Sequence, residues 1–256
     1  AMPEPAHQRF AVVGAGQSAA EVVQYLHTHD PQAEVHSIFN RFGYSPADDS
    51  PYANRIFDPS AVDELHGASP AERERVLTLH RGTNYSVVAP ELIEALYATE
   101  YRERVSGRRR LFMRRASEIV STTESSAGIE IDVRNNLDGA VETLMCDAVV
   151  LATGFEPAPL TPLLGDLAPD GPVLSVDRDY RLPTPEDIGA DIYLQGGTEK
   201  THGLTSSLLS NAAVRAGEIL ASVLGRRELK MSGALGVIGE LDRIPDHHTY
   251  ATSEAR

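Results

Sequence analysis

The feature that most constrains the fold is a glycine loop between an expected strand and an expected helix. Residues 9–13 (RFAVV) are a short apolar run typical of a buried parallel strand. Residues 14–19 (GAGQSA) follow directly, and apolar residues at helical spacing continue to Asp30-Pro31, where the helix should end. Residues 33–39 (AEVHSIF) alternate and predict a second strand. This is a βαβ unit, so the sequence predicts an α/β protein with a Rossmann-like nucleotide-binding domain.

The loop carries Gly-x-Gly-x-x-Ala at the place where dinucleotide binding requires it. Gly14 permits a tight turn, Gly16 lets the backbone approach a pyrophosphate, and Ala19 allows the helix to pack closely on the strand. The helix N-terminus would then face the phosphates with its partial positive charge. We expect a nucleotide here; the alternative is a glycine-rich turn without a ligand.

The end of the second strand bears on which nucleotide binds. An Asp or Glu there would bond the ribose 2′-hydroxyl of NAD or of the FAD adenosine, whereas this chain has Phe39-Asn40-Arg41. An arginine at this place suits a 2′-phosphate, which favours NADPH over NADH. The alternative is that Arg41 is a solvated loop cation.

Coarser patterns organise the rest of the chain. Helices are expected near residues 60–65, 70–79 and 90–105, within a helical insert (42–110) that supplies a wall of the site. The third helix should place Leu92, Ile93, Leu96, Tyr97 and Tyr101 on one face. Strands are expected over 112–120, 128–134, 143–152 and 192–196, and a long amphipathic helix over 204–223.

Composition excludes several classes of function. Acidic side chains outnumber basic ones by 37 to 23, giving a net charge of −14, which argues against a broad nucleic-acid surface. No apolar run is long enough to span a membrane, and no secretory leader is visible. The single cysteine, Cys146, excludes a disulfide framework and a cysteine-rich zinc site. We therefore expect a soluble, cytoplasmic protein with neither nucleic acid nor membrane as partner.

Five motifs occur in a fixed order along residues 8–225. They are 14–21 (GAGQSAAE), 48–54 (DDSPYAN), 83–88 (TNYSVV), 152–155 (ATGF) and 201–210 (THGLTSSLLS). This string closely resembles the flavin-dependent N-hydroxylating monooxygenases of siderophore biosynthesis, above all the L-ornithine N5-monooxygenases.

The resemblance implies an FAD- and NADPH-dependent enzyme that hydroxylates the side-chain amine of L-ornithine, or of a related amine, with O2 through a C4a-hydroperoxyflavin. NADP⁺ would stay bound and shield that intermediate from water. It also implies the glutathione-reductase-like architecture with two dinucleotide-binding domains, and a homo-oligomer, either a tetramer or a dimer.

Site residues carry over from the family motifs one by one. Gln17 and Ser18 would contact the pyrophosphate and nicotinamide side of NADPH, and Tyr85 would lie by its adenosine part. Asn54 and Asn84 would bind the carboxylate and amine of the amino-acid substrate. The remaining expected cofactor contacts are Asn40, Arg41, Thr153 and Gly154, with Leu204, Ser206, Ser207 and Leu208 against the flavin. No catalytic side chain and no metal ligand is assigned.

Plainer interpretations exist for several of these residues. Asn54 follows a Pro-Tyr turn and suits a loop cap, and Asn84 suits the N-cap of a following turn. His202 beside a glycine turn is typical of a structural hydrogen-bonding residue, and Asp48-Asp49 next to Ser-Pro is typical of a turn and cap. His247-His248 has no convergent partner for a metal site.

The chain also departs from the family pattern. The N-terminal FAD-binding segment of the family, with its substrate lysine, has no counterpart here, so the architecture is expected to be incomplete. We expect an NADPH-binding domain over 8–155, the C-terminal part of an FAD-binding domain over 156–230, and a tail over 231–256. The family arginine for the 2′-phosphate aligns with Asn40, and Arg41 stands one position later.

Three hypotheses follow from this departure. The chain is a portion of an ornithine-type N-hydroxylase, which on its own is expected to be inactive, or a stand-alone NADPH-binding module without monooxygenase activity of its own, or a different pyridine-nucleotide flavoprotein that reuses this half-fold. The third fits least well, because the motifs at 83–88 and 201–210 belong to the N-hydroxylases. Ornithine, lysine and a diamine stay open as substrates.

Overall fold

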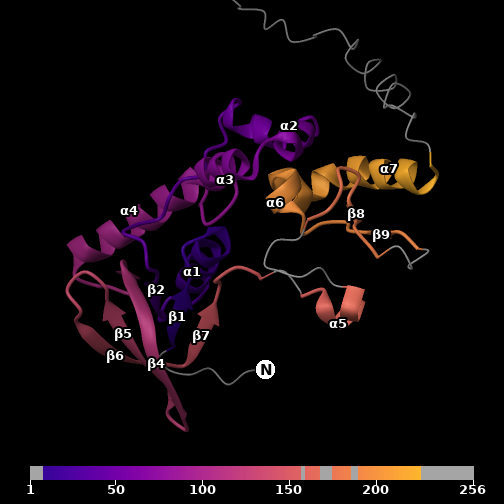
Figure 1. Ribbon diagram of the computed structural model, residues 1–256. Helices are drawn as coiled ribbons and strands as arrows, with labels where there is room; N and C mark the ends of the chain where they lie inside the picture. Colours follow the sequence, from indigo (N-terminus) through magenta and orange to yellow (C-terminus); the bar gives the residue numbers. More distant parts are fainter. Residues whose placement is uncertain (1–7, 157–158, 168–174, 186–189, 226–256) are drawn as a thin grey trace, which may run out of the picture. The chain divides into compact units, whose positions relative to one another are not determined.

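The chain folds into two compact units in a computed structural model that describes residues 8–156, 159–167, 175–185 and 190–225 (Figure 1). Unit 1 comprises the described residues of Ala1–Ala61 and Ala68–Leu160. Unit 2 comprises Val62–Gly67 and the described residues of Thr161–Arg256. The expected tail, 231–256, lies outside the described residues.

Unit 1 is built on a parallel sheet. Its strands are β1 (Arg9–Val13), β2 (Glu34–Ile38), β3 (Leu111–Arg114) and β7 (Ala148–Leu151), in the spatial order β3-β2-β1-β7. All three pairings are parallel, and α1 (Gln17–His29) is the crossover between β1 and β2. The strand–loop–helix–strand pattern predicted from the sequence is confirmed.

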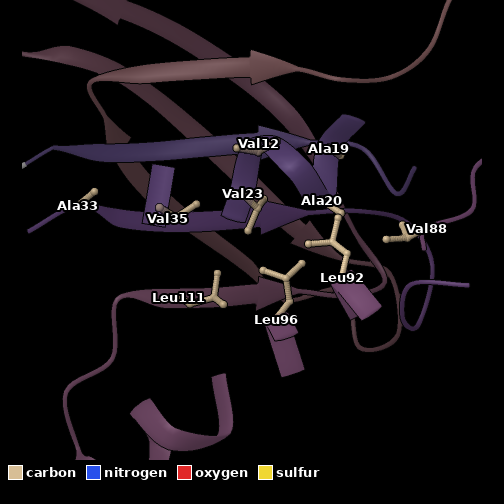
Figure 2. Packing of buried hydrophobic residues seen from close by; sticks show 10 residues of the cluster. All are labelled: Val12, Ala19, Ala20, Val23, Ala33, Val35, Val88, Leu92, Leu96 and Leu111. Atoms are coloured by element: carbon tan, nitrogen blue, oxygen red, sulfur yellow. The ribbon is translucent and has the colours of Figure 1, made fainter. Parts of the chain in front are cut away.

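Helices α1 and α4 (Pro90–Ser106) cover one face of this sheet. Figure 2 shows their shared core, to which β1, α1, β2, α4, β3 and the chain before α4 all contribute: Val12, Ala19, Ala20, Val23, Ala33, Val35, Val88, Leu92, Leu96 and Leu111. Gly107, with φ 73°, ends α4 in the left-handed conformation that favours glycine. Tyr97 and Tyr101, expected on one face with Leu92, Ile93 and Leu96, are 68% and 57% exposed. Tyr97 follows Leu96 by one residue and Tyr101 follows it by five, which turns both side chains away from the stripe that meets the sheet.

The opposite face of the sheet packs on an antiparallel sheet. Its strands are β4 (Ser117–Ser125), β5 (Gly128–Asn135) and β6 (Val141–Cys146), in the order β4-β5-β6. Ala11 and Ile38 of the parallel sheet meet the buried side chains Ile131, Val133, Leu144 and Cys146. The parallel sheet therefore has its helices on one side and a second sheet on the other.

Two strands predicted as continuous are each divided between these sheets. The expected strand 112–120 turns at Arg115–Ala116, where Ala116 has φ 48°, and the expected strand 143–152 turns at Asp147. At the second break the backbone N–H of Asp147 donates to the Arg9 carbonyl at 2.8 Å, so one residue carries the chain from β6 to β7. No glycine or proline marks either break, and the strand predictions were wrong there for that reason.

Shorter helices fill the predicted insert. They are a 3-10 helix at Ala53–Phe57, α2 (Ala61–Gly67), α3 (Pro70–Leu79) and a 3-10 helix at His80–Thr83. Ser69 caps α3 by accepting a hydrogen bond from the Glu72 backbone N–H at 3.2 Å. Residues 62–67, which include most of α2, belong to unit 2.

Unit 2 is made of short elements. They are α5 (Thr161–Leu164), a 3-10 helix at Gly165–Leu167, the antiparallel pair β8 (Arg181–Leu182) and β9 (Ile192–Tyr193), α6 (Glu199–His202), 3-10 turns at Leu204–Ser207 and Leu209–Asn211, and α7 (Ala212–Val223).

The long helix expected over 204–223 begins eight residues late. Residues 204–211 form 3-10 turns instead, because hydroxyl side chains there bond nearby carbonyls: Thr205 Oγ1 to His202 and Ser207 Oγ to Leu204. The buried Arg215 donates to the carbonyls of Thr205 and Leu208 at 2.5 and 3.1 Å, which holds these turns against α7. The expected strand at 192–196 is limited to Ile192–Tyr193.

In the described part of the chain, every helix is too short or too polar to cross a membrane. Within the same residues, no group of His, Cys, Asp and Glu is arranged to hold a metal ion.

Candidate functional site

Gly14 is required by a close approach of two strand ends. Its φ is +144°, and a Cβ there would lie 2.2 Å from the Ala152 carbonyl oxygen, just after β7. Its N–H donates to the Ile38 carbonyl at 3.0 Å, at the end of β2. Gly14 therefore joins the carboxyl ends of three neighbouring strands, which is a packing role in addition to the tight turn.

Gly16 begins α1 and leaves its N-terminus open. No side chain caps the helix, and no acidic residue lies in its first turn. A Cβ on Gly16 would meet only the Ser86 Cα, at 3.6 Å, so this glycine is not demanded by packing in the way Gly14 is. Ser18 is exposed and Ala19 is fully buried, as expected for a helix that packs on β1. The uncapped amides are suited to an anion.

Gln17 links this loop to the segment before α4. Its Oε1 accepts a hydrogen bond from the Ala89 backbone N–H at 2.8 Å, and its Nε2 donates to Glu21 Oε1 at 2.8 Å. The hydrogen bond between Gln17 and Ala89 joins residues 72 positions apart in the sequence. The sequence offers no signal for such a pairing.

A cleft of about 410 Å³ in unit 1 brings two expected site residues together. Gln17 and Asn84 both line it, and the other lining residues are Ala47, Asp49, Thr83, Val87, Ala89, Pro90 and Glu91. Asn54 is not among the lining residues. Its Nδ2 donates to the Asp49 carbonyl at 2.9 Å, which is the loop-bonding role considered for it from the sequence.

Backbone pairing holds the two loops of this cleft together. Ala47 donates to the Val88 carbonyl at 3.0 Å, Val88 donates to the Ser45 carbonyl at 2.9 Å, and Asp48 donates to the Gly82 carbonyl at 3.1 Å. The Asp48 carboxylate accepts from the Ser50 backbone N–H, and hydrogen bonds from Ser50 lower the pKa of Asp48. Asp48 is thus a turn residue, as its Ser-Pro neighbours predicted.

The end of β2 holds the residues expected at the 2′-phosphate. Asn40 is exposed, while Arg41 Nη1 donates to the Ser86 carbonyl at 2.7 Å and to Ser45 Oγ at 3.3 Å. Tyr85 is half-buried and lies outside the cleft lining. Arg41 is therefore hydrogen-bonded to the loop that carries Asn84. Its guanidinium is not a free solvated cation, which was the alternative interpretation.

In unit 2, the residues expected at the flavin lie in 3-10 turns. Leu204 and Ser206 are buried, Leu208 is half-buried and Ser207 is exposed. The hydroxyls of Ser206 and Thr198 are buried and have no hydrogen-bond partner among the described residues. Thr198 was not singled out from the sequence, because a lone threonine before a short helix carries no distinguishing pattern. Unpaired buried hydroxyls need an explanation, and a bound ligand is one.

His202 anchors this region as a structural residue, as its sequence context predicted. It is fully buried, its Nε2 lies 3.0 Å from the Arg178 carbonyl, and its Nδ1 lies 2.8 Å from Thr201 Oγ1. Its ring stacks on Tyr180 at a centroid distance of 4.2 Å, and burial raises the pKa of Tyr180 to about 12. Back in unit 1, Thr153 and Gly154 follow β7 and are exposed.

Comparisons with known proteins identify the family of this chain. The family model of L-lysine 6-monooxygenase/L-ornithine 5-monooxygenase matches residues 3–157. The L-ornithine N(5)-monooxygenase of Pseudomonas aeruginosa is 40% identical over 215 residues, which covers 84% of this chain and 48% of that protein. The Burkholderia cepacia enzyme of the same name is 38% identical over 237 residues, covering 90% of this chain and 53% of the relative. The chain thus spans about half the length of the curated relatives it matches.

Solved structures give the same result. The ornithine N-hydroxylase of Kutzneria sp. 744, determined with reduced FAD, NADP⁺ and L-ornithine, has a TM-score of 0.81 and 43% identity, covering 86% of this chain and 54% of that one. Ornithine hydroxylase from P. aeruginosa has a TM-score of 0.78 and 38% identity, with coverages of 85% and 52%. Because unit 1 alone could not account for these coverages, the likenesses extend over both units. The chain belongs to the L-lysine 6-monooxygenase/L-ornithine 5-monooxygenase family.

Proposed function

We propose that this chain serves the N5-hydroxylation of L-ornithine with O2 in an FAD- and NADPH-dependent monooxygenase of siderophore biosynthesis. The observation that carries the proposal is the cleft of unit 1, which holds Gln17 of the dinucleotide loop and Asn84 of the expected substrate motif together. Family membership and the ligands of the Kutzneria structure support it.

NADPH fits the open N-terminus of α1. Gly16 lets the pyrophosphate approach, and the first-turn N–H groups with Ser18 bind it, because no side chain already caps them. Gln17 then holds the nicotinamide side while its Oε1 remains bonded to Ala89. The remaining contacts of the proposal are Gly14 and Ala19, which shape the loop, and Asn40, Arg41 and Tyr85 towards the adenosine end.

FAD fits the unpaired hydroxyls of unit 2. Ser206 Oγ and Thr198 Oγ1 are buried donors without partners among the described residues, and Leu204 is a buried apolar residue of the same turn as Ser206. Ser207 and Leu208 follow Leu204 and Ser206 along the chain and are proposed as further FAD contacts. Thr153 and Gly154, after β7 in unit 1, remain predicted as cofactor contacts. When bound, FAD supplies the chemistry that activates O2.

The amino-acid substrate is assigned to the cleft and its rim. The Asn84 side chain makes no hydrogen bond within the described residues, so its amide can donate to the substrate carboxylate or accept from its amine. One side-chain N–H of Asn54 donates to the Asp49 carbonyl, and the other N–H and the amide oxygen remain available to the substrate. The carboxylates of Asp49 and Glu91 line the same cleft and favour a cationic amine over an anion.

The test is a spectrum and a product assay on purified protein. Residues 1–256 alone should bind NADPH, and together with an FAD-binding segment of the family's kind they should retain FAD through gel filtration and form N5-hydroxyornithine from L-ornithine, NADPH and O2 in preference to products from L-lysine or cadaverine. In that combination, NADPH binding with neither retained flavin nor product would favour the alternative of an NADPH-binding module. Absence of NADPH binding would refute both.

Asn84→Ala provides the residue-level prediction for substrate binding. In the complete enzyme, we expect the KM for L-ornithine to rise roughly 10- to 100-fold, because a hydrogen bond from an amide to a carboxylate is worth about 1.5–3 kcal/mol, with little change in the KM for NADPH. Steady-state kinetics with each substrate varied in turn measures the two constants, and Asn136→Ala in the β5–β6 turn is the control. Equal changes in both KM values would contradict a substrate role.

A cytoplasmic homo-oligomer, dimer or tetramer, completes the proposal. The single cysteine of the sequence fits a reducing compartment. Light scattering coupled to gel filtration measures the mass in solution, and a monomer at micromolar concentration would contradict the oligomer.

A further inference from the structure

The turn between β3 and β4 lies directly beside the loop that follows β2. The Ala116 backbone N–H donates to the Arg41 carbonyl at 2.7 Å, and the Ser117 N–H donates to the Phe39 carbonyl at 2.8 Å. These two bonds fix the backbone around Arg115 against residues 39–41. In a dinucleotide-binding fold, this is where the ribose of the adenosine end is read.

Arg115 has an exposed and uncommitted guanidinium at this place. Its Cζ lies 4.2 Å from the centroid of the Phe42 ring, an arrangement in which the ring attracts the cation and holds it flat. Neither a hydrogen bond nor an ion pair engages the Arg115 guanidinium in the part of the chain that the structure describes. Phe42 is itself 65% exposed, so the stacked pair faces solvent.

The neighbouring polar side chains are less able to bind a phosphate. Asn40, at the position of the family arginine, carries no charge. Arg41 already donates to the Ser86 carbonyl and to Ser45 Oγ. Arg114 is paired with Glu142 at 2.5 and 2.9 Å and donates to His36 Nδ1 at 3.3 Å. Arg115 is thus the guanidinium of this group that a phosphate can engage without breaking an existing bond.

We propose that Arg115, stacked on Phe42, binds the 2′-phosphate of NADPH and sets the preference for NADPH over NADH. This inference rests on the proposed function, since it assumes that the dinucleotide loop binds a nicotinamide cofactor. A guanidinium presents two parallel N–H donors that match a phosphate, and stacking on Phe42 orders the side chain before the ligand arrives. Asn40 adds no competing charge, and Arg41 keeps its bond to the Ser86 carbonyl.

The experiment is a calorimetric titration of the full chain with two pairs of ligands. NADPH and NADH differ only by the 2′-phosphate, and so do adenosine 2′,5′-bisphosphate and 5′-AMP. In Arg115→Gln, we expect affinity for NADPH and for the bisphosphate to fall roughly 10- to 100-fold, as the loss of a charge-assisted pair predicts. Affinity for NADH and 5′-AMP should change less than about twofold.

Two further variants make the test specific. Arg108→Gln removes the same charge from an exposed site before the opposite end of β3, and it should leave all four affinities unchanged. Phe42→Leu should weaken NADPH binding by less than Arg115→Gln does, because the cation stays but loses its aromatic support.

The outcomes separate this inference from the proposed function. Suppose that the unaltered chain binds NADPH. If Arg115→Gln binds NADPH equally well, or if its affinity for NADH falls as much as its affinity for NADPH, the assignment of Arg115 is wrong while the proposed function stands. The assignment is equally wrong if Arg41→Gln, and not Arg115→Gln, abolishes the preference. If the unaltered chain binds neither NADPH nor NADH, both the inference and the proposed function fail.

Discussion

Gly14 and Gly16 stand two positions apart in one motif, yet different neighbours determine them. At Gly14 a side chain would collide with the Ala152 carbonyl, whereas at Gly16 it would meet only ordinary contact with Ser86. The sequence identified both glycines from the spacing of the motif. It could not separate a glycine needed by the fold from one needed by a ligand, because Ala152 is distant in the chain.

Alanine at each position should therefore give opposite results. Gly14→Ala is expected to lower the free energy of unfolding by roughly 2–4 kcal/mol, because it adds a clash at a φ that L residues rarely adopt. Gly16→Ala should change that free energy by less than about 1 kcal/mol but weaken NADPH binding at least about tenfold.

Urea unfolding and NADPH titration of both variants measure the two effects. Unchanged NADPH affinity in Gly16→Ala would show that the loop does not bind the pyrophosphate. Gly14→Ala with unchanged stability would contradict the close approach to Ala152.

At the level of elements, regular patterns were predicted well and the junctions between elements were not. The helix that became α4 was predicted within one residue of its end, since Pro90 and Gly107 mark its limits. The division of the long predicted strands at Arg115–Ala116 and at Asp147 carries no local signal. The start of α7 at Ala212 depends on Arg215, which donates to the carbonyls of Thr205 and Leu208. These hydrogen bonds form only when the chain is folded.

The expected site shows the same limit. Gln17 and Asn84 could be named from motifs, but their common cleft depends on the contact of Gln17 with Ala89 and on the pairing of Ala47 with Val88. Both contacts join segments far apart in sequence. Residue type and spacing alone give no register for them, so the cleft could not be derived before the fold was known.

Arg110 offers a prediction for how the elements of unit 1 are joined. Its Nη1 donates to the carbonyls of Asp30 at 2.9 Å, Ala33 at 3.2 Å and His27 at 3.3 Å, which ties the end of α1 to the start of β3. Arg110→Met keeps the apolar stem but leaves these carbonyls without that donor. We expect a loss of about 2 kcal/mol in unfolding free energy.

Urea unfolding followed by circular dichroism measures this loss, with Arg108→Met as the matched control. Arg108 is exposed and its side chain makes no hydrogen bond within the described residues, so its loss should cost less than about 0.5 kcal/mol. Equal stability of the two variants would show that the Arg110 bonds do not support the joint.

For the whole molecule, three perturbed groups of unit 1, which are His36, Glu34 and Glu103, make acid destabilising. Burial is the main cause that lowers the pKa of His36 from 6.5, and the hydrogen bond to Glu34 opposes it only partly. Burial raises the pKa of Glu103, but the backbone N–H groups of Arg110 and Leu111 outweigh it and hold the pKa below 4.5. Glu34 behaves alike, because bonds from His36 and Arg9 outweigh its burial.

Stability should therefore fall in two successive pH windows. Below pH 6.5, His36 becomes protonated in the unfolded chain but stays neutral in the folded chain. The free energy of unfolding therefore declines from about pH 6.5 towards the lower pKa of folded His36. The contribution of Glu34 and Glu103 is present above pH 4.5 and is lost as the pH falls below that value towards their folded pKa values.

Urea unfolding of His36→Gln between pH 8 and pH 4 tests the first window. In this variant, the free energy of unfolding should decline less around pH 6 and should still decline below pH 4.5. His29→Gln, at an exposed position, should retain both declines. A His36→Gln profile parallel to that of the unaltered chain would show that another group is responsible.

The turn at Arg115–Ala116, where the chain passes from the parallel to the antiparallel sheet, also has a practical consequence for protein engineering. Its bond to the Arg41 carbonyl is made before the β4–β5 hairpin begins, and the far end of that hairpin, at Ser125–Gly128, is largely exposed and lines no part of the cleft. A tag or reporter can be inserted at that distal end without altering the turn. One residue added at the turn itself, in contrast, must either displace the Ala116 bond to the Arg41 carbonyl or shift the pairing of β4 with β5 by one position, and such a shift turns the side chains of β4 to the opposite face.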